Sequence, residues 1–115
     1  MARKLVGRSG STGSHQVIFK GDLTIRSIAQ AHARLRDALQ AHASLTVGVA
    51  SDAVADLTFI QLVESARRSA RESGKQFSLA ASAEGPLRET LERGGFLGAN
   101  DAARRDFWLM ERGGL

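Results

Sequence analysis

The stretch ADLTFIQL, residues 55–62, places a carboxylate and a hydroxyl immediately before an apolar run. An acid and a hydroxyl two residues apart, here Asp56 and Thr58, are typical of a helix start, where side-chain oxygens accept hydrogen bonds from free backbone amides. The same two groups could instead present their chemistry to a partner at the helix tip. This pair is therefore the first candidate functional site.

The helix-start interpretation gives each neighbouring residue a role. If Thr58 is the N-cap, its hydroxyl accepts from the amide of Gln61 and the Gln61 side chain reaches back, which forms a Thr-x-x-Gln capping box. Leu57 can then pack onto Leu62 as a hydrophobic staple. The sequence predicts this arrangement together with a helix over residues 59–73.

The same pattern occurs earlier in the chain as DLTI, residues 22–25. There, Leu23 can staple onto Ile28. Asp22 and Asp56 both lie near the positive end of an expected helix dipole, which stabilises a carboxylate by about 0.3 to 1 kcal/mol. Capping alone can explain both copies, so the choice between a cap and a functional tip stays open at this point.

Residues suited to catalysis or metal binding form no recognisable set. The chain has no cysteine, and no Ser-His-Asp set or paired carboxylate spacing stands out. His15, His32 and His42 lack the spacing of metal ligands. The loop GRSGSTGSH is rich in glycine, but no lysine follows Gly10 or Gly13 as a phosphate-binding P-loop requires. We predict that the protein is not an enzyme and that it has no cofactor and no metal.

Length and composition limit the class of protein. A chain of 115 residues with 43% hydrophobic residues fits one domain, which we expect over residues 1–115. The absence of cysteine agrees with a reducing cytosol. The longest apolar runs are shorter than the roughly 20 residues that span a bilayer, and the N-terminus lacks the apolar stretch of a signal peptide. We therefore expect a cytoplasmic protein, and its net charge of +4 suits an acidic partner.

Apolar periodicity predicts alternating strands and helices. Strands are expected over residues 15–20, 45–49 and 75–81, with a short one at 4–6, and helices over 24–40, 59–73 and 86–94. Residues 51–55 are expected to form a loop, and the C-terminal segment can be either a final strand or a docked helical turn. This order predicts an α/β fold with a mixed β-sheet of four or five strands and packed helices.

The apolar positions also predict which faces are buried. In the first strand, Val17 and Phe19 are expected on one side and Ile18 on the other, with both sides partly buried. The helix over 24–40 is expected to bury one stripe, formed by Ile25, Ile28, His32, Leu35 and Leu39. Gly74 is expected to end the second helix.

Two long stretches repeat the order strand, acidic turn or loop, and helix: VIFKGDLTIRSIAQAHARLRDAL and VASDAVADLTFIQLVESARRSARESGKQFSLAA. A third stretch, GPLRETLERGGF, follows as another helix. Over these residues, 17–96, the chain resembles a STAS domain, the module named after sulfate transporters and anti-sigma-factor antagonists. The resemblance implies a STAS-like fold and a non-enzymatic regulatory module of bacterial signal transduction and transcription.

In the anti-sigma-factor antagonists that the chain resembles, a serine or threonine at the tip of the second helix is phosphorylated by a partner kinase. The matching phosphoacceptor position here is Thr58, and Asp56 matches the acid that precedes it. Leu57 and Phe59 depart from the family pattern, which often has a hydroxyl residue and a glycine there. The resemblance implies partner binding around this loop, by Asp22, Asp56, Leu57, Phe59 and Gln61.

The implied partner is a protein: an anti-sigma-factor kinase, a chemosensory protein, or the ATPase of a lipid-transporting ABC complex. In the ABC case Leu57 and Phe59 would be permanent contacts and Thr58 would stay unmodified. A hypothesis of another class is a surface for nucleic acid or an anionic membrane, formed by Arg67, Arg68, Arg71, Arg104 and Arg105. The interspersed Glu64 and Glu72 favour a solvated helix face over such a basic site.

Overall fold

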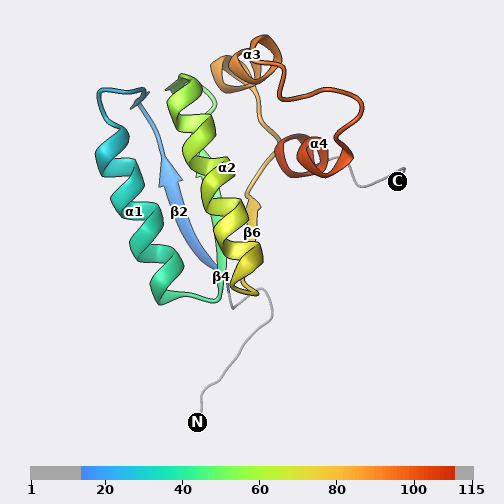
Figure 1. Ribbon diagram of the computed structural model, residues 1–115. Coiled ribbons are helices and arrows are strands. Elements are labelled where there is room, and N and C mark those ends of the chain that lie inside the picture. Colours follow the sequence, from blue (N-terminus) through green and yellow to red (C-terminus); the bar gives the residue numbers. More distant parts are fainter. Residues whose placement is uncertain (1–13, 111–115) are drawn as a thin grey trace.

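The computed structural model describes residues 14–110, with a parallel sheet at the centre (Figure 1). This sheet has three strands in the order β2, β4, β6, which are His15–Phe19, Ser44–Val49 and Gln76–Leu79. Two shorter strands, β3 (Asp22–Leu23) and β5 (Val54–Ala55), pair with each other in a second parallel ladder. The α/β class predicted from the sequence is confirmed.

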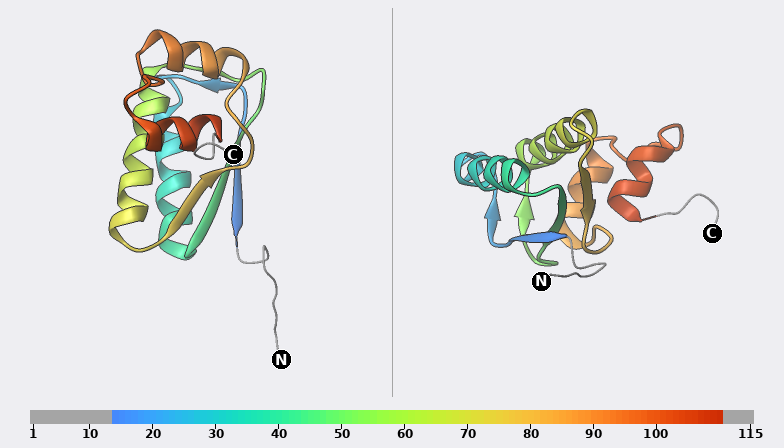
Figure 2. Two further views of the ribbon diagram at one scale, coloured as in Figure 1. Left: turned by 90° about the vertical axis from the view of Figure 1, so that its right-hand side faces the viewer. Right: turned by 90° about the horizontal axis from the view of Figure 1, so that it is seen from below.

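Four helices complete the described part of the chain: α1 (Ile28–Ala41), α2 (Leu57–Glu72), α3 (Gly85–Arg93) and α4 (Ala102–Leu109). Figure 2 shows α1 and α2 side by side on one face of the three-stranded sheet. The helix α3 packs near β5, and α4 packs near β6. Within residues 14–110, no helix has the length and apolarity needed to cross a membrane.

The alternation of side chains in the strands places the core between the sheet and the helices α1 and α2. Val17 and Phe19 of β2 are buried, as is Val47 of β4. Ile18 is 55% exposed, so the prediction that both sides of this strand are partly buried is wrong. The reason is that α1 and α2 cover the same face of the sheet (Figure 2).

The first helix begins later than the sequence predicts. Residues 24–27 form a turn, and α1 begins at Ile28. Ile25 therefore lies outside the helix and is 63% exposed. His32, expected on the buried stripe, is exposed. Leu35 is buried as predicted, and the other buried positions of α1 are Ala31 and Ala38.

The second helix begins earlier than predicted, at Leu57, and ends as expected before Gly74, which has a φ of 72°. The predicted loop at 51–55 contains the strand β5. The described strands form one three-stranded and one two-stranded sheet, and all their pairs are parallel, which differs from the single mixed sheet expected. The strand predicted at 4–6 lies outside the described residues.

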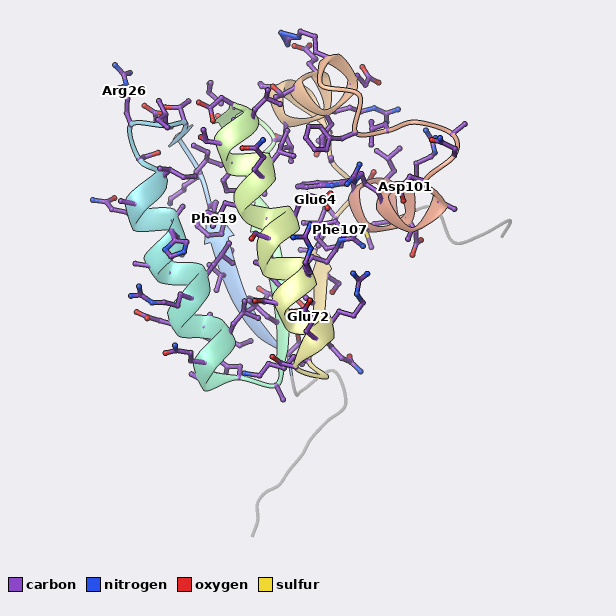
Figure 3. All side chains as sticks on the ribbon, viewed as in Figure 1. Phe19, Arg26, Glu64, Glu72, Asp101 and Phe107 are labelled. Carbon is purple, nitrogen blue, oxygen red and sulfur yellow. The ribbon has the colours of Figure 1, made fainter. Side chains whose placement is uncertain are left out.

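The C-terminal segment contains a docked helix, α4. Trp108 is fully buried, and its indole N–H donates to Oε2 of Glu64 on α2 over 2.7 Å. Nε of Arg104 lies 3.2 Å from the same carboxylate oxygen. Phe107 stacks on Phe77 of β6 with ring centroids 5.8 Å apart. Figure 3 shows Glu64 and Phe107 in the space between α2 and α4, and these contacts fix α4 against α2 and β6.

Candidate functional site

The two DLT sequences, residues 22–24 and 56–58, lie close together because β3 and β5 pair in parallel. In this ladder Asp22 is opposite Val54, and Leu23 is opposite Ala55. We call the two segments the DLT junctions. They meet at the end of the sheet where α1 and α2 begin (Figure 1).

Asp56 is the N-cap of α2. Its Oδ1 accepts from the amide of Thr58 over 3.0 Å, from the amide of Phe59 over 3.4 Å and from the Thr58 hydroxyl over 2.5 Å. Thr58 is therefore a donor within the first turn of the helix, and the prediction of Thr58 as the N-cap is wrong. The carboxylate caps the helix because it accepts several hydrogen bonds and carries the charge that the helix dipole favours.

The second oxygen of Asp56 connects α2 to the turn that follows the first junction. Oδ2 accepts from the amide of Ile25 over 3.0 Å. Asp22 repeats only the local part of this pattern, since its Oδ1 accepts from the amide of Thr24 over 3.1 Å and from the Thr24 hydroxyl over 2.5 Å. The turn at 24–27 separates Asp22 from the start of α1. Asp56 thus joins two parts of the site, whereas Asp22 orders one.

Hydrogen bonds lower the pKa of both carboxyl groups. For Asp22 the main cause is the hydroxyl of Thr24, and the Arg26 guanidinium, 3.5 Å from Oδ2, acts in the same direction. For Asp56, desolvation by burial would by itself raise the pKa. The hydroxyl of Thr58 and three backbone amides more than offset this effect, so the pKa of Asp56 lies below its ordinary value. The site is therefore acidic at neutral pH.

The lowered pKa of Asp56 predicts a loss of stability in acid. Because the unfolded chain binds this proton more readily than the folded chain, the stabilisation is complete above the ordinary pKa of 3.8 and falls as the pH drops through the lowered value. At neutral pH, we expect Asp56→Asn to lower the free energy of unfolding by about 1 kcal/mol, because the side chain loses its charge at the helix start and an NH2 group in place of Oδ2 cannot accept from the amide of Ile25. Urea unfolding at about pH 7 and about pH 3 should show this difference shrinking in acid. If the difference in unfolding free energy between the two proteins stayed constant or grew in acid, Asp56 would not stabilise the fold through its ionised carboxylate.

Three large apolar side chains are exposed around the DLT junctions. Ile25 is 63% exposed, Val54 is 55% exposed and Leu57 is 46% exposed. Gln61, one turn along α2 from Leu57, is exposed as well. We call this region the junction surface, and define it by Asp22, Ile25, Val54, Asp56, Leu57 and Gln61.

Phe59 does not belong to the junction surface. It is fully buried and meets Phe19 edge to face, with ring centroids 5.5 Å apart. The prediction that Phe59 contacts a partner is therefore wrong. Residues two apart in a helix point in different directions, so Leu57 faces solvent while Phe59 faces the sheet. Thr58 lies between them and is half-buried.

The sequence analysis missed Ile25 and Val54 as surface residues. Ile25 was assigned to a buried helix stripe, although the exposed turn at 24–27 contains it. Val54 was assigned to a loop, although it forms part of β5 opposite Asp22. Sequence position could have indicated both residues, because Ile25 and Val54 each lie within two residues of a DLT junction.

The described residues offer no metal centre. No group of three His, Cys, Asp or Glu side chains that could hold a metal occurs within residues 14–110. His15 and His42 stack on each other with ring centroids 3.8 Å apart. Gly10 and Gly13, from the glycine-rich loop, lie outside the described residues.

Comparisons of the chain with models of protein families, with curated proteins and with solved structures find no match. The class of protein is therefore defined by the fold and by the candidate site. It is an α/β domain with parallel strands, and it presents an acidic and apolar surface where two helices begin.

Proposed function

We propose that the protein is a regulatory protein-interaction module of the anti-sigma-factor-antagonist kind, with a STAS-like fold, which binds its partner through the junction surface. The observation that supports this most is the exposure of Ile25, Val54 and Leu57 beside the hydrogen-bonded carboxylate of Asp56. In this proposal the protein acts in the cytoplasm by binding, without a reaction of its own.

A protein partner fits the chemistry of the junction surface. Clustered large apolar side chains on a surface are typical of interaction sites. The hydrogen bonds of Asp56 hold the Ile25 amide and the first turn of α2 in place, so less conformational freedom is lost when a partner binds. The carboxylates of Asp22 and Asp56 flank the apolar side chains and complement basic residues on the partner.

Thr58 is the phosphoacceptor in this proposal. Its hydroxyl donates to Oδ1 of Asp56, and the residue is half-buried next to the exposed Leu57. A kinase that transfers a phosphoryl group from ATP to this oxygen removes the hydrogen bond and adds about 1.5 to 2 negative charges. The start of α2 tolerates this charge because of the helix dipole, but the apolar contact beside it does not. Phosphorylation then releases the partner while the helix stays folded.

The test is a charge placed in the apolar part of the junction surface. We expect Ile25→Asp to weaken partner binding by about tenfold or more, because the new carboxylate must be desolvated in the contact. The partner is first isolated from the organism's own cells by pull-down with the unmodified chain, and its affinity is then measured by titration calorimetry. The matched control is Ile18→Asp, since Ile18 is 55% exposed and lies on the sheet face turned away from α1 and α2.

The outcomes separate the forms of this proposal. An anti-sigma-factor kinase or a chemosensory protein as the partner supports the switch, whereas an ABC-transporter ATPase supports a permanent accessory subunit. Equal affinities of the folded Ile25→Asp variant and the unmodified chain would exclude the junction surface as the binding site. Weaker binding by the folded Ile18→Asp variant would place the contact on the sheet face instead.

A further inference from the structure

A second surface, separate from the junction surface, lies between α2, β6 and α4. A groove of about 450 Å³ occurs there. In Figure 1, β6 is the right-hand strand of the sheet, α2 lies in front of the sheet, and α4 lies to the right of β6. Its lining combines cations with large apolar side chains and includes Arg67, Arg71, Lys75, Phe77, Phe107 and Met110.

The strand β6 contributes an unpaired edge to this groove. Among the described strands, β6 pairs with β4 alone and ends the three-stranded sheet. The amides of Gln76 and Ala80 donate to carbonyls just before and within β4. Because backbone groups alternate along a strand, the N–H and C=O groups of Phe77 and Leu79 point away from β4. Such an edge can pair with an extended segment of another chain.

Cations border the same edge. Arg71 is exposed in the last turn of α2. Arg67, one turn earlier, lies over the ring of Phe107 at 5.1 Å from its centroid and pairs with Glu64. Lys75 also lines the groove, although its ammonium group donates to the carbonyl of Leu39 on α1, and one acidic residue, Asp106, lines it as well. The lining therefore carries an excess of positive charge, which attracts an acidic ligand.

The apolar part of the groove is built from aromatic rings. Phe77 of β6 and Phe107 of α4 stack with an interplanar angle of 6°. Met110, at the end of α4, is 36% exposed and lines the same groove. In a peptide that pairs with a strand edge, side chains alternate in direction, so one set can contact these apolar groups while the other stays near the cations.

We propose that the groove binds an acidic peptide segment in extended conformation, which adds a strand along β6 and places carboxylates against Arg71 and Arg67. The backbone groups of Phe77 and Leu79 supply main-chain hydrogen bonds for such a strand. The guanidinium groups select acidic over basic sequences. This interaction is independent of the junction surface and of any modification at Thr58.

The probe is a fluorescein-labelled peptide of alternating Glu and Val, about ten residues long, which exceeds the typical strand length. Fluorescence anisotropy should show saturable binding to the full chain, and ¹⁵N–¹H spectra should show shifts at the amides of Phe77 and Leu79. We expect Arg71→Glu to weaken binding by about tenfold, because a like charge then faces the peptide carboxylates. The matched control is Arg68→Glu, which changes net charge equally at an exposed position of α2 outside the groove lining.

Several results would overturn the proposal. One is no binding of the probe, and another is equal weakening by Arg71→Glu and Arg68→Glu, which would indicate general attraction to a basic chain. If the amide chemical shifts changed only at the start of α2, the peptide would bind at the junction surface and not in the groove. A single-stranded oligonucleotide that binds more tightly than the peptide, with the same dependence on Arg71, would assign the groove to nucleic acid.

Discussion

Phe59→Ala is expected to lower the free energy of unfolding by about 3 to 5 kcal/mol, which is a large part of the stability of a domain of this size. The Phe59 side chain is fully buried and meets the ring of Phe19 edge to face. Its removal leaves a cavity between α2 and β2, and the packed sheet can close that cavity only in part. Urea unfolding followed by circular dichroism measures the change.

The matched control is Leu57→Ala, two residues earlier in the same turn. Leu57 is 46% exposed, so this change is expected to alter the free energy of unfolding by no more than about 0.5 kcal/mol. A large loss for Leu57→Ala together with a small loss for Phe59→Ala would mean that the start of α2 is rotated from the position described. It would also remove Leu57 from the junction surface.

The interior of α2 could be predicted from the sequence, but its first turn could not. The buried positions Ile60, Val63 and Ala66 follow helical spacing, and Gly74 ends the helix with a positive φ. At the start, both Asp56 and Thr58 have oxygens that can cap a helix. The sequence analysis assigned the cap to Thr58, two residues too late. The partner contact expected for Phe59 came from the family resemblance, and the burial of Phe59 contradicts it.

The arrangement of the candidate site depends on contacts between distant parts of the chain. The repeated DLT pattern indicated two similar helix starts. Only the pairing of β3 with β5 shows that the two DLT sequences lie close together. These strands have two residues each, which is too short for an alternating pattern. The hydrogen bond from the Ile25 amide to Asp56 spans 31 residues and has no local signal. Asp22, Asp56, Leu57 and Gln61 were among the residues predicted to bind a partner. Ile25 and Val54 lie close to the same DLT sequences, but their exposure became evident only from the structure.

The hydrogen bond between Thr58 and Asp56 gives a phosphoryl group at Thr58 two effects. The hydroxyl now donates to Oδ1 of Asp56, whereas a phosphorylated oxygen has no hydrogen to donate. Phosphate also brings negative charge against a carboxylate whose lowered pKa keeps it ionised at neutral pH. The two like charges repel, and any displacement of Asp56 loosens its hydrogen bond with the amide of Ile25. One modification can therefore disturb both DLT junctions.

Thr58→Asp is expected to stay folded and to lose partner affinity by about a hundredfold, because a second carboxylate then lies beside Asp56 in the contact. Thr58→Ala is expected to keep binding and to lower the free energy of unfolding by about 0.5 to 1.5 kcal/mol, the value of one lost hydrogen bond. Titration calorimetry with the partner obtained by pull-down measures the affinities, and urea unfolding measures the stabilities.

The matched control for Thr58→Asp is Ser69→Asp, which adds the same charge at an exposed position of α2. Three helical turns separate the two positions, so the new carboxylate lies on nearly the same side of the helix but about 16 Å further along it. A contact centred on the junction surface predicts that Ser69→Asp binds as the unmodified chain does, since that distance exceeds a Debye length at physiological salt. If Thr58→Asp also binds as tightly as the unmodified chain, and protein from its own cells carries no phosphate at Thr58, the switch must be abandoned. The Thr58 hydroxyl would then serve only to hold Asp56 at the start of α2.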